Sequence, residues 1–160
     1  TDSHDRQGKV TDEAPWEHIA LETIREKAKE FTGEIVQVPP MVSALKHEGT
    51  RLYKLARQGK TVPREGRPVT VHELRFDKKD GKFVDFFASV SKGTYVRTLV
   101  SDLGDALGCH AALANLRRLR SGKFDLEQSV TIDALRGMAF EEMRERVLPL
   151  RASYADSQRP

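Results

Sequence analysis

The segment 67–97 constrains the fold most, because it contains two runs of strand-forming residues separated by a turn sequence. RPVTVHELRF and KFVDFFASVSKGTYVR are rich in valine and phenylalanine, and the intervening DKKDG contains an Asp-Gly pair. Such a pattern predicts a β-hairpin. If the second strand continues through Arg97, Tyr95 and Arg97 point to the same side of it, because side chains two residues apart share a face of a strand.

Helical periodicity is found on both sides of this hairpin. A helix is predicted over residues 16–31, where apolar residues recur at helical spacing, and Gly33 would end it. A second helix is predicted over 96–107, and two more over 132–140 and 141–148. These elements predict an α+β fold with a mixed, mostly antiparallel sheet that is flanked by helices.

A Pro-Pro pair at positions 39 and 40 separates the first helix from the hairpin. The run EIVQV before it is extended, and the prolines exclude a central strand and force a stiff exit. GTRLYKLARQGK follows, with Gly49 and Gly59 at its ends. On a helix, its leucines would share one side and Tyr53 and the cations the other. We expect a short helix on an excursion from the sheet.

The net charge of +3 is distributed unevenly over the 160 residues. Cations greatly outnumber acids in residues 46–67, and residues 111–123 contain cations and no acid. Basic segments with an interleaved aromatic residue such as Tyr53 suit RNA binding, through phosphate contacts and base stacking. The same segments also suit ordinary solvated faces, and the residues alone leave both interpretations open.

The sequence excludes several other classes of protein. The single cysteine, Cys109, allows no internal disulfide, and the histidines show no metal-ligand spacing, so we expect no metal. There is no phosphate-binding glycine loop and no nucleophile elbow. No apolar run is long enough for a bilayer and no signal peptide opens the chain. We therefore expect a cytoplasmic protein without membrane contact.

Tyr95 and Arg97 are the first residues that suggest chemistry. A tyrosine can stack on a base, and an arginine can hold a carboxylate or phosphate in a bidentate manner. The alternative is an edge-strand tyrosine beside an exposed arginine, and the pattern alone does not decide between the two. Carboxylates that catalysis could use are Asp2, Asp5, Asp12 and Asp102, of which Asp102 is in mid-helix, where a surface role is the simpler interpretation.

Four stretches of the sequence carry a resemblance to a known family. In chain order they are TDSHDRQGKV, FTGEIVQVPPMVSALKHEGTRLYKLARQGKTVPREGRPVTVHEL, SKGTYVRTLVSDLGDALGCHA and LRRLRSGKF. In this order and at this spacing they resemble the bacterial tRNA pseudouridine synthase B family over nearly the whole chain. The resemblance implies the pseudouridine synthase fold, the T-arm stem-loop of tRNA as partner, and isomerisation of a T-loop uridine without cofactor or metal.

The resemblance also implies roles for single residues. Tyr95 would contact the target base, Arg97 would pair with the catalytic aspartate, and Leu116 would form an apolar wall beneath the base. Residues 39–67 would be a thumb-like insertion that clasps RNA. The implied RNA contacts are Lys46, Arg51, Tyr53, Arg57, Arg64, Lys92, Arg117 and Arg118.

The chain departs from the family pattern at the nucleophile. In the family, the nucleophilic aspartate stands in a glycine-containing loop upstream of the TDS segment, and no aspartate of this chain stands in that motif. Residues 1–150 would thus form an incomplete catalytic domain, with a tail at 151–160 and no PUA domain. We expect the chain alone not to isomerise uridine, and a separate polypeptide with the N-terminal half would complete the site. The alternative function is a non-catalytic RNA-binding or tRNA-folding module.

Overall fold

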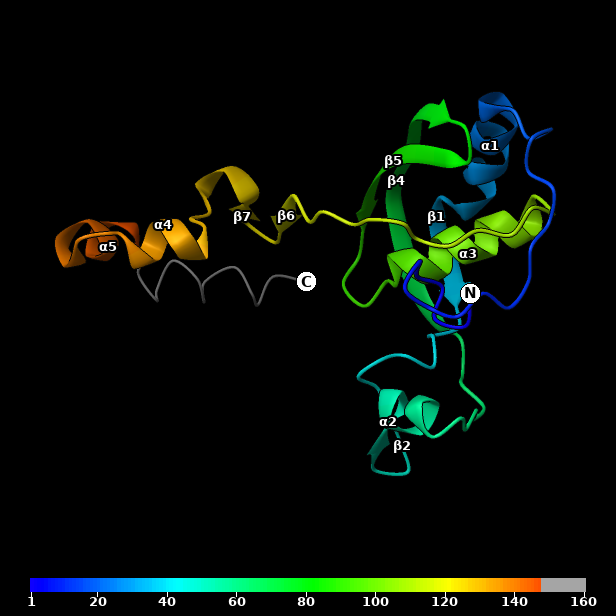
Figure 1. Ribbon diagram of the computed structural model, residues 1–160, viewed down its shortest axis with the longest axis horizontal. Helices are drawn as coiled ribbons and strands as arrows, with labels where there is room; N and C mark the ends of the chain where they lie inside the picture. Colours follow the sequence, from blue (N-terminus) through cyan, green and yellow to red (C-terminus); the bar gives the residue numbers. More distant parts are fainter. Residues whose placement is uncertain (148–160) are drawn as a thin grey trace. The chain divides into compact units, whose positions relative to one another are not determined.

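The computed structural model describes residues 1–147 and divides the chain into two units, residues 1–116 and residues 117 onward (Figure 1). The predicted boundary at residue 150 and the predicted tail at 151–160 lie outside the described residues. No helix in the described part of the chain is both long enough and apolar enough to cross a membrane.

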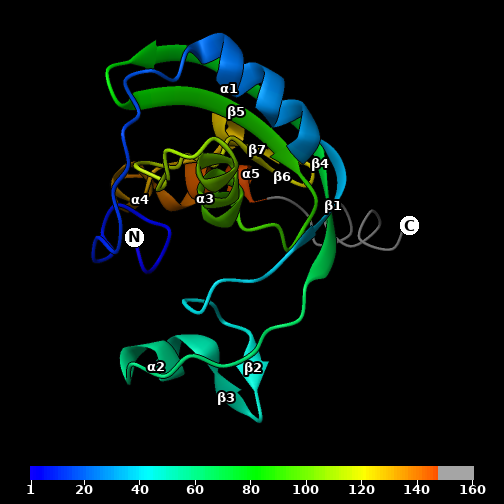
Figure 2. The ribbon, with the colours of Figure 1, turned by 90° about the vertical axis from the view of Figure 1, so that its right-hand side faces the viewer.

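The first unit is built on the predicted hairpin. Strands β4 (Arg67–Asp80) and β5 (Phe83–Val90) pair antiparallel around a two-residue turn, in which Gly81 has a φ of +56°. Strand β1 (Gly33–Gln37) pairs antiparallel with the other side of β4, so the strand order is β1-β4-β5. Register shifts along the β4–β5 pair accompany the curvature of the ribbon in Figure 2. The position of β1 at the sheet edge agrees with the Pro-Pro pair that follows it.

The second strand of the hairpin ends earlier than predicted. β5 stops at Val90, and the chain turns through Gly93, which has a φ of +88°. Helix α3 (Val96–Ala106) then begins directly after Tyr95. The expectation that the strand continues through Arg97 is therefore wrong, because a left-handed glycine turns the chain out of the sheet before Tyr95 is reached.

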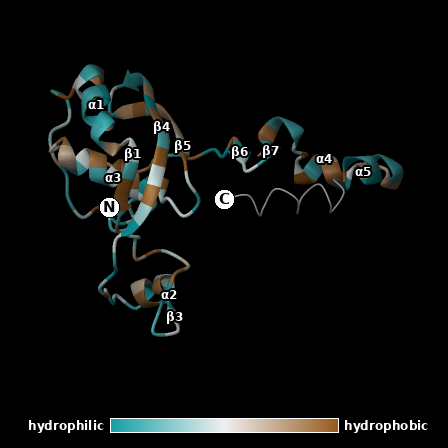
Figure 3. Ribbon diagram, turned by 180° about the vertical axis from the view of Figure 1, so that it is seen from behind, coloured by the Kyte–Doolittle hydropathy of each residue, from teal (hydrophilic) through white to brown (hydrophobic). Residues whose placement is uncertain are grey.

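Helices α1 and α3 complete the core of this unit. Helix α1 (Leu21–Ala28), which continues into the 3-10 turn η1 (Lys29–Phe31), begins later than predicted because Ala20 is extended and the preceding residues form a turn. In Figure 3 it is largely hydrophilic, because only one of its faces joins the core. The core cluster of buried side chains is Ile19, Ile24, Ala28, Phe76 and Leu103. Helix α3 matches its prediction, and Gly108 with a φ of +72° follows its end.

Between β1 and β4 lies a small substructure, which we call the thumb (residues 38–66). It contains the two-residue strands β2 (Lys46–His47) and β3 (Thr50–Arg51) and the predicted short helix α2 (Leu52–Arg57). The turn residues Glu48 and Gly49 both have positive φ, as a tight hairpin turn requires. Leu52 is 3% exposed and provides the apolar contact of α2.

The second unit consists of short elements. They are β6 (Arg120–Ser121), β7 (Phe124–Asp125), the 3-10 turn η2 (Leu126–Gln128), α4 (Ile132–Arg136) and α5 (Phe140–Arg146). Helix α4 is shorter than predicted because Gly137 ends it, and the hydroxyl of Thr131 caps its start by accepting from the Ala134 N–H. None of residues 117–147 is buried.

Candidate functional site

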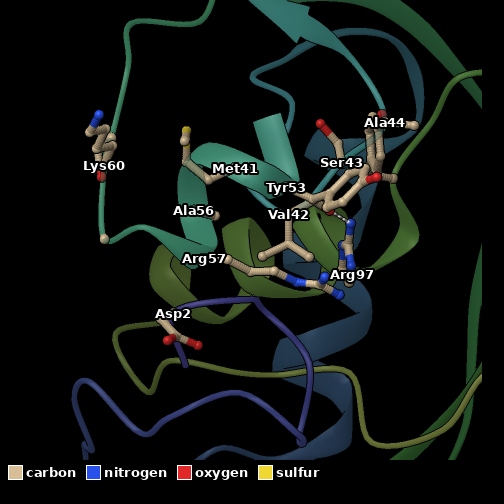
Figure 4. A pocket seen from close by; sticks show the side chains of 13 residues that line it. Asp2, Met41, Val42, Ser43, Ala44, Tyr53, Ala56, Arg57, Lys60 and Arg97 are labelled. Carbon is tan, nitrogen blue, oxygen red and sulfur yellow. Dashed lines mark hydrogen bonds between the residues drawn. The ribbon is translucent and has the colours of Figure 1, made fainter. Parts of the chain in front are cut away.

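An open cavity of about 750 Å³ lies between the thumb, the start of α3 and the N-terminal segment (Figure 4). We call it the site cavity. It is bounded by the backbone at 41–44, by α2 and the residues after it, and by Asp2. The charged and tyrosine side chains on its wall are Asp2, Tyr53, Arg57, Lys60, Tyr95 and Arg97.

The structure brings Tyr95 and Arg97 together at the start of α3. Tyr95 is the extended residue directly before the helix, with φ −95° and ψ 100°, and Arg97 is in the first turn. The Arg97 Cζ lies 5.7 Å from the centroid of the Tyr95 ring, and one Nη of Arg97 donates to the Val42 carbonyl. The two side chains thus share a surface as expected, but a helix start and not a strand brings them together.

The loop that precedes Tyr95 is tied to the sheet at Ser91. The Ser91 N–H donates to the Thr70 carbonyl (2.8 Å), and the Ser91 hydroxyl accepts from the Thr70 N–H (2.9 Å). Between Ser91 and Tyr95, Gly93 takes the left-handed conformation at φ +88° with open space where a Cβ would stand. The SKGTY sequence therefore forms a short loop that follows β5, and its first residue is fixed to β4 by two hydrogen bonds.

The thumb presents a second tyrosine–arginine pair to the site cavity. Tyr53 and Arg57 are one turn apart on α2, and the Arg57 Cζ lies 5.4 Å from the Tyr53 ring centroid. The Tyr53 N–H donates to the Ser43 carbonyl (3.0 Å), which fixes the helix to the chain at residues 41–44. A guanidinium over a ring keeps its edge N–H groups available to an anion, so both pairs offer a stacking face beside a cation.

Asp2 is a cavity residue whose position the sequence did not reveal. Its Oδ1 accepts from the Lys9 N–H (3.0 Å), and the turn that it closes is tight, because a Cβ at Gly8 would lie 2.6 Å from the same oxygen. This carboxylate is therefore engaged in holding the N-terminal turn. Among residues 1–147, no ion pair of Arg97 with a carboxylate is recorded.

His4 is a partly buried histidine whose pKa is lowered chiefly by its burial. Its pKa is lowered from the ordinary value of 6.5, first by burial, then by the amino group of Thr1 and by Arg97. Its Nδ1 is buried and has no hydrogen-bond partner in the described part of the chain, and its backbone has a φ of +60°. The cations disfavour protonation of the ring, and the same charges favour an anion. No group of three histidine, cysteine or acidic side chains within residues 1–147 is arranged to hold a metal ion.

Three predicted RNA contacts of the first unit lie outside the site cavity on exposed positions. Lys46 is on β2, Arg51 is on β3, and Lys92 is in the loop before α3. Lys92 lines a smaller cavity of about 200 Å³ together with Gln37 and Tyr95. Their side chains are available to solvent, and their contact with RNA stays a prediction.

Arg64 occupies a different environment from the other predicted contacts. Its Nη1 donates to the Pro39 carbonyl (3.0 Å), and its Nε is buried with no hydrogen-bond partner among residues 1–147. It therefore links the outgoing and returning segments of the thumb near its base. This link leaves only part of the guanidinium for RNA.

Leu116, Arg117 and Arg118 lie at the junction of the two units. Leu116 is the last residue of the first unit, is 60% exposed and does not line the site cavity. Arg117 and Arg118 begin the second unit and are exposed. The wall role of Leu116 and the RNA contacts of the two arginines stay predictions.

Comparisons with known proteins agree with the resemblance. The family model "TruB family pseudouridylate synthase (N terminal domain)" matches residues 1–96, and "tRNA pseudouridylate synthase B C-terminal domain" matches residues 97–153. The tRNA pseudouridine synthase B of Geobacter sulfurreducens is 45% identical over 139 residues, which are 87% of this chain and 46% of that protein. That of Escherichia coli K12 is 42% identical over 149 residues, 93% of this chain and 47% of the relative.

The chain thus spans about half the length of these curated relatives. Among solved structures, a chain in the crystal structure of a Cbf5-Nop10-Gar1 complex superposes with a TM-score of 0.64 at 31% identity, and covers 82% of this chain and 37% of that one. This likeness confirms the pseudouridine synthase fold. On the matched family models, which together span residues 1–153, the chain belongs to the TruB family of pseudouridylate synthases.

Proposed function

We propose that this chain supplies the RNA-binding face and the tyrosine–arginine side of the active site of a tRNA pseudouridine synthase. The reaction would be that of the family: a T-loop uracil is detached from C1′ of its ribose, turned and rejoined through C5, without cofactor or metal. Two tyrosine–arginine pairs facing one cavity are the observation that carries the proposal. A tRNA substrate would be met in the cytoplasm.

The site cavity suits a nucleotide that has left its stack. A base that is flipped out of an RNA loop loses its stacking partners, and an aromatic side chain returns about 1–3 kcal/mol per base. Tyr95 and Tyr53 offer such faces from opposite elements, the start of α3 and the thumb. Arg57 and Lys60 stand on the same wall, where they would neutralise the phosphates on either side of the base.

Arg97 is suited to hold the nucleophile. Its guanidinium donates to the Val42 carbonyl, a neutral acceptor that a carboxylate would displace with a stronger, charge-assisted bond. A carboxylate held in this way has a lowered pKa and stays ionised, as a nucleophile must. We propose that this carboxylate comes from a segment outside residues 1–160, in the same polypeptide or in a separate one.

The experiment measures pseudouridine in T-arm RNA, by release of the labelled C5 hydrogen of uridine. This chain is assayed alone and after fusion to the N-terminal half of the Geobacter sulfurreducens relative. We expect product from the fusion and none from the chain alone. In the fusion, Arg97→Met should lower kcat by about 10²–10³-fold, because a donor to the reacting groups is lost. Arg136→Met, an exposed arginine of α4 paired with Asp133, is the matched control.

Two outcomes would contradict the proposal. Wild-type turnover by Arg97→Met would show that Arg97 has no role in the reaction. Product from the chain alone would place the nucleophile within residues 1–160, and Asp2→Asn would then be the first variant to test. A fusion that binds T-arm RNA tightly but forms no product would favour the non-catalytic RNA-binding module. In that case Arg51, Arg57 and Arg118 would matter for binding, and Tyr95 and Arg97 would matter little.

A further inference from the structure

Gln37 is a buried amide at the end of an edge strand. It is the last residue of β1 and is 2% exposed, whereas Val36 beside it is 74% exposed. A buried amide costs free energy unless each of its polar atoms is paired. An apolar residue would avoid that cost at this position. A glutamine at this buried position therefore needs one group that donates to its oxygen and one that accepts from its nitrogen.

The partner of Gln37 is the backbone of Tyr95. The Gln37 Oε1 accepts from the Tyr95 N–H (2.8 Å), and the Gln37 Nε2 donates to the Tyr95 carbonyl (3.2 Å). This pair of opposed bonds imitates the exchange between two residues of an antiparallel sheet. It reaches across 58 positions of the sequence, and it satisfies both ends of the amide.

The backbone conformation of Tyr95 depends on these two hydrogen bonds. It is the residue before α3, and within residues 1–147 no side chain caps the start of that helix. Its carbonyl also accepts the first helical bond, from the Leu99 N–H (3.0 Å). Its N–H has Gln37 as partner, so loss of the amide would leave a partly buried donor unpaired. The φ and ψ of Tyr95 set both the direction of its ring and the start of the helix that carries Arg97.

The loop before α3 is therefore held at both ends. Ser91 is bonded in both directions to Thr70 of β4, and Tyr95 is bonded in both directions to Gln37 of β1. Gly93 makes the turn between these two points. Such a loop enters the reaction already shaped, and preorganised groups lose less freedom when the substrate binds.

We propose that Gln37 is a positioning residue for Tyr95 and, through the first turn of α3, for Arg97. The inference rests on the proposed function for its effect on the reaction, but the order of the Tyr95 ring can be measured without any activity. Gln37 does not line the site cavity and would not touch the reacting atoms. Its removal should therefore impair turnover more than RNA binding.

The first experiment measures the Tyr95 ring itself. The purified chain is labelled with fluorotyrosine, and the three tyrosines are assigned in the fluorine NMR spectrum with Tyr95→Phe and Tyr53→Phe. Gln37→Met keeps the shape and removes both hydrogen bonds. It should shift and broaden the Tyr95 resonance and leave that of Tyr53 unchanged. Gln37→Glu keeps the acceptor for the Tyr95 N–H, and should displace the resonance less.

Arg25→Met is the matched control. Arg25 of α1 also makes a long-range bond to backbone, from its Nε to the Phe76 carbonyl (2.9 Å), but on a part of β4 away from Thr70 and the Tyr95 loop. It should leave the Tyr95 resonance in place. An unchanged Tyr95 resonance in Gln37→Met, or an equal change in Arg25→Met, would overturn the inference. Should Gln37→Met fail to fold, the same criterion applies to Gln37→Glu.

The second experiment uses the fusion protein described above. Gln37→Met should lower kcat by about 10–100-fold with KM within about threefold, because misplacement of about 1 Å costs up to about 100-fold. Arg25→Met should lower the unfolding midpoint and keep kcat. Equal losses of kcat in both variants would reduce Gln37 to a stabilising residue. If the wild-type fusion forms no pseudouridine, the proposed function fails, and the fluorine NMR result still decides the positioning role.

Discussion

At the scale of single residues, the site cavity is made of pairs that are close in sequence. Tyr53 and Arg57 lie one helical turn apart, and Tyr95 and Arg97 lie on either side of a helix start. In both, the flat guanidinium lies over the ring of its partner. Arginine suits this role because it stacks while its edge still donates, whereas the ammonium of lysine is a point charge.

Arg57→Lys tests the stacking separately from the charge. We expect T-arm RNA to bind about two- to fivefold more weakly, because lysine keeps the charge but lacks the planar fork that can stack on Tyr53 and donate to a phosphate at the same time. The salt dependence should stay that of the wild type, because the charge is kept. Arg57→Met should also lower the slope of log K against log salt by about one. Titrations at several salt concentrations measure both quantities, and a slope that falls in Arg57→Lys would contradict the expectation.

His110 gives the first unit a dependence on pH. Its Nδ1 lies 2.6 Å from Asp105 Oδ1 and its Nε2 3.4 Å from Asp12 Oδ2, and its pKa is raised from 6.5, chiefly by the hydrogen bond to Asp105. Because the folded state holds the proton more tightly, its contribution to stability is complete below pH 6.5 and is lost as pH rises through the folded pKa.

Urea unfolding at a series of pH values measures this contribution. His110→Asn should flatten the fall in unfolding free energy above pH 6.5, and asparagine tolerates the φ of +48° found at this position. His18→Asn, at an exposed position, is the control and should follow the wild type. A wild-type slope in His110→Asn would show that the two carboxylates do not act through this ring.

At the scale of secondary structure, the sequence predicts the elements that local residue patterns determine, but it does not predict the features that depend on distant contacts. The apolar spacing of α3 and the strand formers of β4 and β5 predict these elements. The β2–β3 hairpin escapes prediction because each strand has only two residues. The backbone contact of Tyr95 before α3 is not readable locally either, since its partner is a glutamine 58 positions away.

The same division holds for the candidate site. Tyr95 and Arg97 could be selected from the sequence, because their residue types and the SKGTY motif mark them. Asp2 could not be placed on the same cavity, because only the tertiary fold brings the N-terminal turn beside α3. Arg64 looks like any other cation of the thumb in the sequence, and only the structure reveals its bond to the Pro39 carbonyl.

Gly104 tests how closely α3 packs against the chain that returns after it. A Cβ at this position would lie 2.4 Å from the backbone nitrogen of Ala111. We expect Gly104→Ala to destabilise the first unit by about 1–3 kcal/mol, although alanine is the better helix former by about 1 kcal/mol. Gly137→Ala, where the nearest atom lies at 3.8 Å, is the control and should be near neutral. Thermal unfolding measures the stability of both variants, and a stabilised Gly104→Ala would contradict this packing.

At the scale of the whole molecule, the two units differ in how they are stabilised. The recorded buried apolar side chains extend from Ile19 to Leu113, all in the first unit, and residues 117–147 contain no buried residue. The short elements of the second unit rely on local hydrogen bonds such as the cap at Thr131. Segments with few buried contacts open at low free energy.

Residues 1–116 should therefore unfold like the longer chain. We expect a fragment that ends at Leu116 to keep the urea midpoint of the first unit, because the recorded core is contained in it. Circular dichroism at increasing urea concentration measures this midpoint. A markedly lower midpoint would mean that residues beyond 116 contribute to the core.

The thumb leaves and rejoins the sheet at one pair of register partners. Gln37 and Arg67 are register partners in the β1–β4 ladder, so the whole of residues 38–66 is inserted between two paired positions. An insertion of this kind can lengthen, shorten or change its sequence without shifting the strands beneath it, since longer loops add little closure entropy. The sequence of the thumb, with its proposed RNA contacts, could thus change while Gln37 and its bonds to Tyr95 stay in place. A thumb from a relative could be exchanged between Gln37 and Arg67, and the sheet would keep its register.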